Sequence, residues 1–161
     1  DCILQVCGQL NLKTGGPGFN FFKTRGGLSG FPPVEEFTTN EMRRMIYAHK
    51  IRMEPVPVFG AFDCPDAGLP TPRRSQSTTA IQALNLFNSS FVIDQADAFA
   101  KRVQTEAGES VEQQAALAFR LAVGRPLTAA EKGPVLNAIR THGLSTLCRA
   151  LFNSSEFLFI P

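Results

Sequence analysis

The side chains that could carry out chemistry gather in one short stretch that lacks a regular hydrophobic pattern. Asp63, Asp66 and Arg74 lie close together there, among several prolines. A carboxylate can act as a general acid or base, and a neighbouring arginine can hold an anionic substrate. Tyr47 and His49 precede this stretch on a predicted helix and could join the same polar cluster. These five residues are the candidates for an enzyme site.

The same charges also have a structural interpretation, which we favour. A segment without secondary structure leaves backbone groups unpaired, and aspartate and arginine side chains can satisfy them. We therefore expect Arg74 to pair with Asp63 or Asp66 and to tie the segment to the helix that starts near Thr79. A lone histidine such as His49 is more often an ordinary surface residue than a catalytic one.

The sequence offers few ligands for a metal ion or a haem. Its two histidines, His49 and His142, lie far apart, and no Cys-x-x-Cys-His haem attachment is present. The cysteine spacing matches no zinc site. We expect neither a metal nor a cofactor in this chain. The four cysteines are expected to be buried free thiols, or to include one long-range pair such as Cys64 with Cys148 in an exported protein; they are Cys2, Cys7, Cys64 and Cys148.

Composition limits the classes of protein that need considering. A chain of 161 residues with 43% hydrophobic residues is long enough for one ordinary domain with a real core. A net charge of +2 is too small to favour nucleic-acid binding. No apolar run approaches the roughly 20 residues that cross a bilayer, and no signal-peptide pattern is visible. We expect a single domain over 1–161 without a membrane span.

The elements that must position the polar cluster are predicted to be helices. Residues 1–10 show helical spacing without a capping residue, so we expect the tail of a longer helix and a C-terminal fragment of a larger multidomain protein. Residues 11–38 are a Gly/Pro-rich loop, and 39–161 form the helical domain. The expected helices cover about 40–53, Ser77 or Thr78 to Asn88, 90–107, Ser110 to Gly124, Thr128 through Ile139, and Ser145 onward.

No segment alternates convincingly with a period of two, so the predicted fold class is mainly α. It is an irregular helical bundle of about six helices, with a long N-terminal loop and an irregular Pro-rich segment at 55–76. In the helix that ends at Asn88 we expect Ile81, Leu84 and Phe87 to face inward. At the N-terminus, Ile3, Val6 and Leu10 should be only partly buried, so self-association through them is possible.

Five motifs stand out in the sequence: Arg43-Arg44-x-Ile46-Tyr47, Phe62-Asp63-x-Pro65-Asp66, Arg74-x-x-Ser77-Thr78, Gly124-Arg125-Pro126-Leu127-Thr128-x-x-Glu131 and Leu151-Phe152-Asn153-x-x-Glu156-Phe157. Together they resemble a domain of unknown function found in large planctomycete proteins. Family members usually have Pro where Ala80 stands, and often a Cys near Pro70, so a cysteine-based role for that loop is in doubt here. The predicted helix that ends at Asn88 also carries two amide side chains, Gln82 and Asn85. We expect these amides to hydrogen bond to loop backbone.

The resemblance implies an exported, periplasmic parent protein with a cytochrome-c-like domain upstream, so that any haem lies elsewhere in the parent. The family signature then falls on Arg43, Arg44, Asp63, Asp66, Arg74, Gln82, Asn85, Arg125 and Glu131.

Two functions of different classes follow. The first is a non-catalytic structural and interaction module of an exported, redox-linked multidomain protein, whose partners are the other domains of that protein. The alternative is part of an enzyme that acts on an anionic or polysaccharide substrate through Asp63, Asp66 and Arg74. A buried, mutually paired segment favours the first, and an open pocket favours the second.

Overall fold

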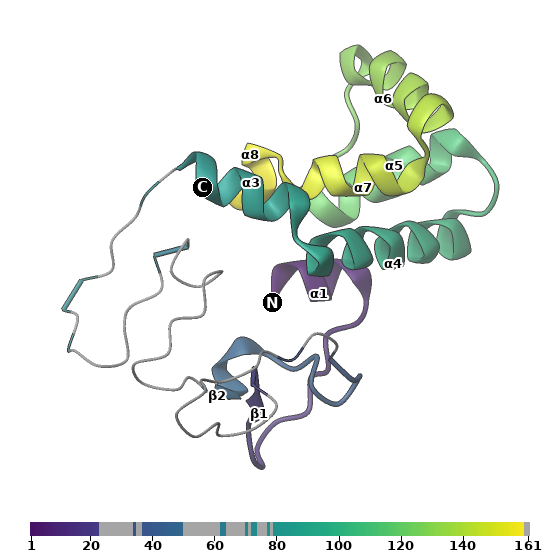
Figure 1. Ribbon diagram of the computed structural model, residues 1–161. Coiled ribbons are helices and arrows are strands. Elements are labelled where there is room, and N and C mark those ends of the chain that lie inside the picture. Colours follow the sequence, from purple (N-terminus) through teal and green to yellow (C-terminus); the bar gives the residue numbers. More distant parts are fainter. Residues whose placement is uncertain are drawn as a thin grey trace. The chain divides into compact units, whose positions relative to one another are not determined.

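The computed structural model describes residues 1–22, 34, 37–49, 62–63, 70, 72–73, 77 and 79–159. Over these residues the protein is mainly helical, with one small two-stranded sheet, which confirms the predicted fold class (Figure 1). The chain divides into two compact units. One comprises Asp1 and Gln9–Gln82, and the other comprises Cys2–Gly8 and Ala83–Pro161. The prediction of a single domain stays a prediction.

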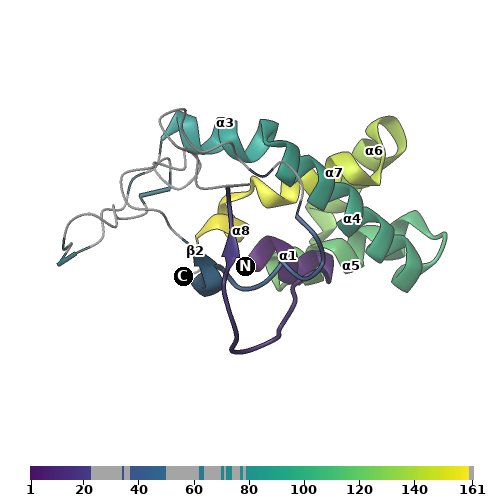
Figure 2. The ribbon, with the colours of Figure 1, turned by 60° about the horizontal axis from the view of Figure 1, so that its bottom comes forward.

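The helices of the second unit pack around α4, the longest of them. Helix α4 contacts α1, α5 and α7, while α6 lies against α5 and α7 (Figures 1 and 2). The short α8 packs on α5 and α7. The elements are α1 (Cys2–Cys7), α3 (Ala80–Asn88), α4 (Ser90–Ala107), α5 (Val111–Val123), α6 (Ala129–His142), α7 (Leu144–Phe152) and α8 (Ser155–Leu158).

The core of this unit lies between α4 and α7. Phe99 and Phe152 are fully buried, and their rings stack with centroids 5.6 Å apart. Val103 and Cys148 are also inaccessible and extend the same core along the two helices. The apolar stripe predicted for 90–107 is confirmed, because its members Val92, Ala96, Phe99 and Val103 are all buried.

Local signals set the ends of three helices as predicted. Ser110 caps α5 by accepting from the Gln113 N–H, and Gly124 ends that helix in the left-handed conformation with φ of 77°. Thr128 and Glu131 form the capping box that starts α6. Helix α4 runs over the predicted 90–107 and ends at Gly108.

The first unit contains the small sheet. Strand β1 (Phe19–Asn20) pairs in parallel with β2 (Ala48–His49), and the 3₁₀ turn η1 (Met45–Tyr47) leads into β2. The aromatic rings of Phe19, Phe21 and Phe37 meet edge to face beside β1. No other strand occurs among the residues that the structure describes.

The helix predicted over 40–53 is wrong for 40–49. Only half of the predicted capping box forms: the Glu41 carboxylate accepts from Thr38 N and Thr38 Oγ1, but the Glu41 N–H donates to the Thr38 carbonyl and not to its hydroxyl. These contacts close a turn and not a helix, since the Met42 carbonyl then accepts from the Asn11 N–H of a distant segment. The helix propensity of this segment is overridden by a tertiary contact. Residues 50–53 lie outside the described part of the chain.

Two further predictions are wrong at the level of single residues. Ile81 and Leu84 are each 63% exposed and Phe87 is 43% exposed, so the residues predicted to face inward do not. Leu86 is the buried residue of α3 instead. Ser145 lies inside α7, where its hydroxyl donates to Asp97 Oδ1, and Gly143 takes the capping position.

Helix α1 buries Leu4 and Cys7, whereas Ile3, Val6 and Leu10 are half-buried, as predicted. Self-association through them stays a prediction. Over the described ranges, the helices lack the combination of length and hydrophobicity that crossing a bilayer demands.

Candidate functional site

The first candidate, Asp63, is bound by a serine of its own segment. Both carboxylate oxygens of Asp63 accept from Ser77: Oδ2 from the backbone N–H at 2.6 Å and from Oγ at 2.8 Å, and Oδ1 from Oγ at 3.0 Å. Asp63 has a positive φ of 54°, a region that Asp tolerates better than most residues. Its predicted partner Arg74, and Asp66 as well, lie outside the described residues.

Ser77 continues this contact to the start of α3. The Gln82 side chain donates to Ser77 Oγ at 3.0 Å and accepts from the Thr79 N–H at 3.1 Å, while Thr79 Oγ1 accepts from the Gln82 N–H. Thr79 and Gln82 therefore form a reciprocal cap one position after the predicted Thr78. Asn85 is half-buried and forms no side-chain hydrogen bond within the described residues. A serine and an amide thus link Asp63 to this helix.

Arg43 organises the glycine-rich loop. It is only 6% exposed, and its guanidinium donates to three backbone carbonyls: Nη2 to Lys13 O at 2.9 Å and Gly15 O at 2.7 Å, and Nη1 to Pro17 O at 2.8 Å. These carbonyls occupy alternate positions of the loop, so one side chain fixes its path. The loop residues themselves are exposed, so the buried Arg43 side chain is what holds them in place.

Tyr47 completes this arrangement. The Arg43 guanidinium carbon lies 3.9 Å from the centre of the Tyr47 ring, within the range of a cation–π contact. The Tyr47 hydroxyl accepts from the Gly15 N–H at 2.9 Å. The Tyr47 carbonyl also lies against Gly18, where the Cβ of any other residue would collide with it. Tyr47 is thus occupied with the loop.

The remaining candidates of this unit form exposed contacts. Arg44 pairs with Asp1 at 3.4 Å, and the other oxygen of Asp1 accepts from the Met45 N–H at 2.8 Å. His49 Nδ1 lies 2.9 Å from Asn20 Oδ1, across the paired strands. Within the described residues, neither Tyr47 nor His49 hydrogen bonds to Asp63, so the predicted polar cluster is not assembled by direct contacts there.

A cavity of about 530 Å³ opens beside the Arg43 loop. Its size is in the range of small-molecule sites. Charged side chains, amides and aromatic rings share its wall with loop backbone. The lining residues are Lys13, Gly15, Gly16, Pro17, Gly18, Phe19, Asn20, Phe22, Val34, Asn40, Glu41 and Arg43.

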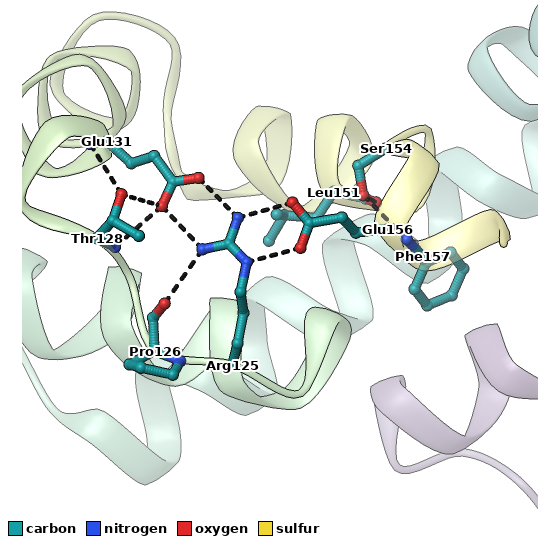
Figure 3. A network of polar contacts seen from close by, with 8 residues as sticks. All are labelled: Arg125, Pro126, Thr128, Glu131, Leu151, Ser154, Glu156 and Phe157. Carbon is teal, nitrogen blue, oxygen red and sulfur yellow. Dashed lines mark hydrogen bonds and ion pairs between the residues drawn. The ribbon is translucent and has the colours of Figure 1, made fainter. Parts of the chain in front are cut away.

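In the helical unit, Arg125 joins three helices (Figure 3). It follows α5 and binds Glu131 of α6 through Nη1 at 2.9 Å and Nη2 at 2.7 Å. It also binds Glu156 of α8, through Nε at 2.6 Å and Nη2 at 2.7 Å. The last Nη1 hydrogen goes to the Pro126 carbonyl at 3.2 Å. A guanidinium has five N–H donors, and all five are used.

These contacts set the charge states of the network. Hydrogen bonds from Arg125, and then from Thr128, hold the pKa of Glu131 well below its usual value. The pKa of Glu156 is lowered chiefly by its hydrogen bonds from Arg125. The same two carboxylates raise the pKa of Arg125. All three groups are therefore charged over the ordinary pH range, and two negative charges surround one positive charge.

A second cavity, of about 650 Å³, lies next to Arg125. Arg125 has no donor left to offer a ligand there, and Glu106, which also lines it, already pairs with Arg102 at 2.7 Å. Among the described residues, no three His, Cys, Asp or Glu side chains gather as metal ligands would. The cavity beside Arg43 is therefore the better candidate site.

Sequence reasoning missed three partners. Glu156 belongs to a motif that was noted, but nothing indicated that it binds Arg125, which lies 31 residues away. Asp1 and Ser77 were not considered as partners of Arg44 and Asp63. The only signal in the sequence was that Arg125, Glu131 and Glu156 all lie in the quoted motifs, and this does not specify a contact.

Comparison with known proteins identifies one relationship. The sequence model of a family described as PSD1, protein of unknown function (DUF1553), matches residues 1–139. Neither a curated protein nor a solved structure gives a significant match to the chain. The matched range includes Arg43, Asp63, Arg125 and Glu131, and it ends before Glu156.

Proposed function

Because the chain belongs to the PSD1 family of proteins of unknown function, we propose a role from its own geometry: a non-catalytic structural and interaction module. It packs against other domains of an exported, redox-linked parent protein. The sequence motifs shared with planctomycete proteins that carry cytochrome-c-like domains support the nature of the parent. In this proposal the haem belongs to the upstream domain and the parent works in the periplasm.

The observation that carries the proposal is how the signature arginines are used. Arg125 spends all five donors on Glu131, Glu156 and a carbonyl. Arg43 spends three donors on the loop backbone. An arginine that clamps a substrate needs donors directed at the substrate, whereas one that supports a fold directs them at its own chain. Arg125 supports the fold with all of its donors, and Arg43 does so with three of its five.

Stability measurements test this assignment without knowledge of a substrate. Replacing a residue that supports the fold destabilises it, whereas replacing a catalytic residue often leaves stability unchanged or raises it. We expect Arg43→Met and Arg125→Met each to lower the urea midpoint, while Arg120→Met, a matched exposed arginine of α5, leaves it unchanged. Unchanged midpoints for Arg43→Met and Arg125→Met would contradict the proposal.

The character of the parent is tested on the full-length protein. Cell fractionation should place it in the periplasm, and its absorption spectrum should show a haem Soret band that this chain alone lacks. Sedimentation of this chain with the remainder of the parent should give a complex. A cytoplasmic parent without haem would leave the structural role but remove the redox-linked setting.

One observation favours the alternative of an enzyme acting on an anionic or polysaccharide substrate. Asp63 is a non-glycine residue with positive φ, and such conformations are enriched at functional sites. The test is an assay of hydrolysis on anionic and neutral polysaccharides, in which the release of reducing ends measures the activity. Activity that Asp63→Asn abolishes without a change in the urea midpoint would establish this alternative.

A further inference from the structure

Arg43 is a buried cation without a carboxylate partner. Its three acceptors are neutral carbonyls, and no ion pair of Arg43 occurs among the described residues. Burying a charge is unfavourable unless an opposite charge or strong dipoles compensate for it. The carbonyls and the Tyr47 ring compensate in part. The loop therefore keeps a positive charge that a negative group could neutralise further.

The donors of Arg43 are also not all used. Its Nε is buried and has no hydrogen-bond partner within the described residues. One hydrogen of Nη1 is likewise without an acceptor there, because Nη1 donates only to the Pro17 carbonyl. Arg125 differs in this respect, since all of its donors are used. A buried donor without a partner is unfavourable by about 1–3 kcal/mol in general, so the charge of Arg43 is incompletely compensated by the described residues.

The cavity of about 530 Å³ brings other groups beside Arg43. Lys13 lines it and forms no ion pair with the described residues. Glu41 lines it too, and hydrogen bonds from the Thr38 backbone and hydroxyl lower its pKa, so it stays ionised. Among the described residues that line the cavity, two side chains are positive and one is negative. This part of the lining suits a ligand with a negative charge.

We propose that this cavity binds a small ligand through a carboxylate, which Arg43 and Lys13 neutralise. A carboxylate carries a single negative charge and two acceptor oxygens, which suit the positive charges of Arg43 and Lys13. Asn20 and Asn40 add amide groups to the wall, and Phe19 and Phe22 add apolar surface. The site goes beyond the structural role proposed above and does not depend on it.

Three probes separate the carboxylate from the rest of a ligand. Sodium glucuronate presents a carboxylate on a hydroxylated ring, sodium acetate presents the carboxylate alone, and glucose presents the ring alone. Isothermal titration calorimetry of the whole chain, with ionic strength matched by sodium chloride, measures each. We expect glucuronate to bind and glucose not to bind. Acetate, which presents the carboxylate alone, is expected to bind no more tightly than glucuronate. Equal binding of glucose and glucuronate, or no binding of either carboxylate, would overturn the proposal.

Three single substitutions place the binding in this cavity. Lys13→Met should weaken glucuronate binding by up to about five-fold, the upper end of what an exposed charge pair contributes. Glu41→Gln keeps an acceptor for Thr38 but removes the repelling charge, and it should tighten binding by a similar factor. Lys101→Met, on the exposed face of α4, is the matched control and should have no effect. If Lys13→Met and Lys101→Met weaken binding equally, the cavity is not the site.

Discussion

The Arg125 guanidinium and the Glu156 carboxylate form two parallel hydrogen bonds, of 2.6 and 2.7 Å, between residues 31 positions apart. This planar pairing fixes orientation as well as distance. Glu131 forms a second such pair with the other side of the same guanidinium. The end of α5, the start of α6 and α8 therefore share a single charged centre (Figure 3).

Substitutions of Arg125 should separate the contribution of its hydrogen-bond geometry to stability from the contribution of its charge. Arg125→Lys keeps the positive charge but loses the planar set of five donors, so we expect its melting temperature to lie between those of wild type and Arg125→Ala. Circular dichroism at 222 nm measures the three transitions. Arg120→Ala is the control on the same helix, because Arg120 is exposed and has no ion pair in the described part of the chain. An Arg125→Lys variant as stable as wild type would show that charge alone matters.

Stability should depend on the ionisation of the two glutamates. Their pKa values in the folded state lie below the usual 4.5, so the unfolded state binds more protons as acid is added. The stabilisation is complete above the usual pKa and is lost as the pH falls through the lowered values. The urea concentration at the unfolding midpoint should therefore decrease as the pH is lowered below 4.5. The decrease should be less steep for Glu131→Gln. Glu109→Gln, an exposed glutamate in the turn between α4 and α5, should follow the wild-type profile.

The described cysteines should differ sharply in reactivity. Burial raises the pKa of Cys7 to about 12 despite the nearby Arg102, and raises that of Cys148 to about 12 with further contributions from Cys7 and Asp97. Cys2 is exposed. At pH 8 a maleimide should label Cys2 quickly, and Cys7 and Cys148 only after urea is added, because the thiolate is the reactive form. Peptide mass mapping assigns each site. Rapid labelling of Cys148 in the native protein would contradict its burial.

Gly18→Ala should disrupt the loop around Arg43. An added Cβ would collide with the Tyr47 carbonyl oxygen, and backbone cannot move aside as a flexible side chain can. The chain has one tyrosine and no tryptophan, so its fluorescence reports on Tyr47 alone. We expect altered emission and stronger acrylamide quenching. Gly133→Ala, where a Cβ meets nothing within 4 Å, should leave the emission unchanged.

The stacked pair of Phe99 and Phe152 should dominate the core energetics. Phe152→Ala removes a fully buried ring and should lower the free energy of unfolding by about 3–5 kcal/mol. Phe159→Ala, at a residue that is 55% exposed, is the control and should change it by less than about 1 kcal/mol. Equilibrium urea denaturation measures both.

The sequence predicted well those features that short-range chemistry determines. The caps at Ser110 and Thr128 depend on residues three positions apart, and the apolar stripe of α4 repeats within a few turns. Over 40–49 the predicted helix is wrong, because the Met42 carbonyl accepts from Asn11 and Arg43 binds carbonyls 26 to 30 residues upstream. No local pattern encodes such a contact. The candidate site was missed for the same reason, since its cavity is built from separate parts of the first unit.

Pairing of distant charges was the least predictable feature. Glu131 and Glu156 both lie in motifs noted in the sequence, yet only the folded chain brings them to Arg125. Asp63 was predicted to pair with an arginine, and in the described residues its oxygens are occupied by Ser77. Its predicted partner Arg74 lies outside the described residues, so that pairing stays a prediction, and the described partners of the carboxylate are a hydroxyl and an N–H.

The path of the chain through its two units has a consequence for limited proteolysis. Helix α1 belongs to the same unit as α4, although the stretch Gln9–Gln82 lies between them in sequence. Arg102 donates to the Val6 carbonyl at 2.7 Å, and the Cys7 thiol donates to the Gln95 carbonyl at 3.1 Å. A six-residue helix is not stable by itself, so these contacts keep it folded. A single cut within 9–82 should therefore leave the N-terminal fragment bound non-covalently, and the two pieces should co-elute until denaturant separates them.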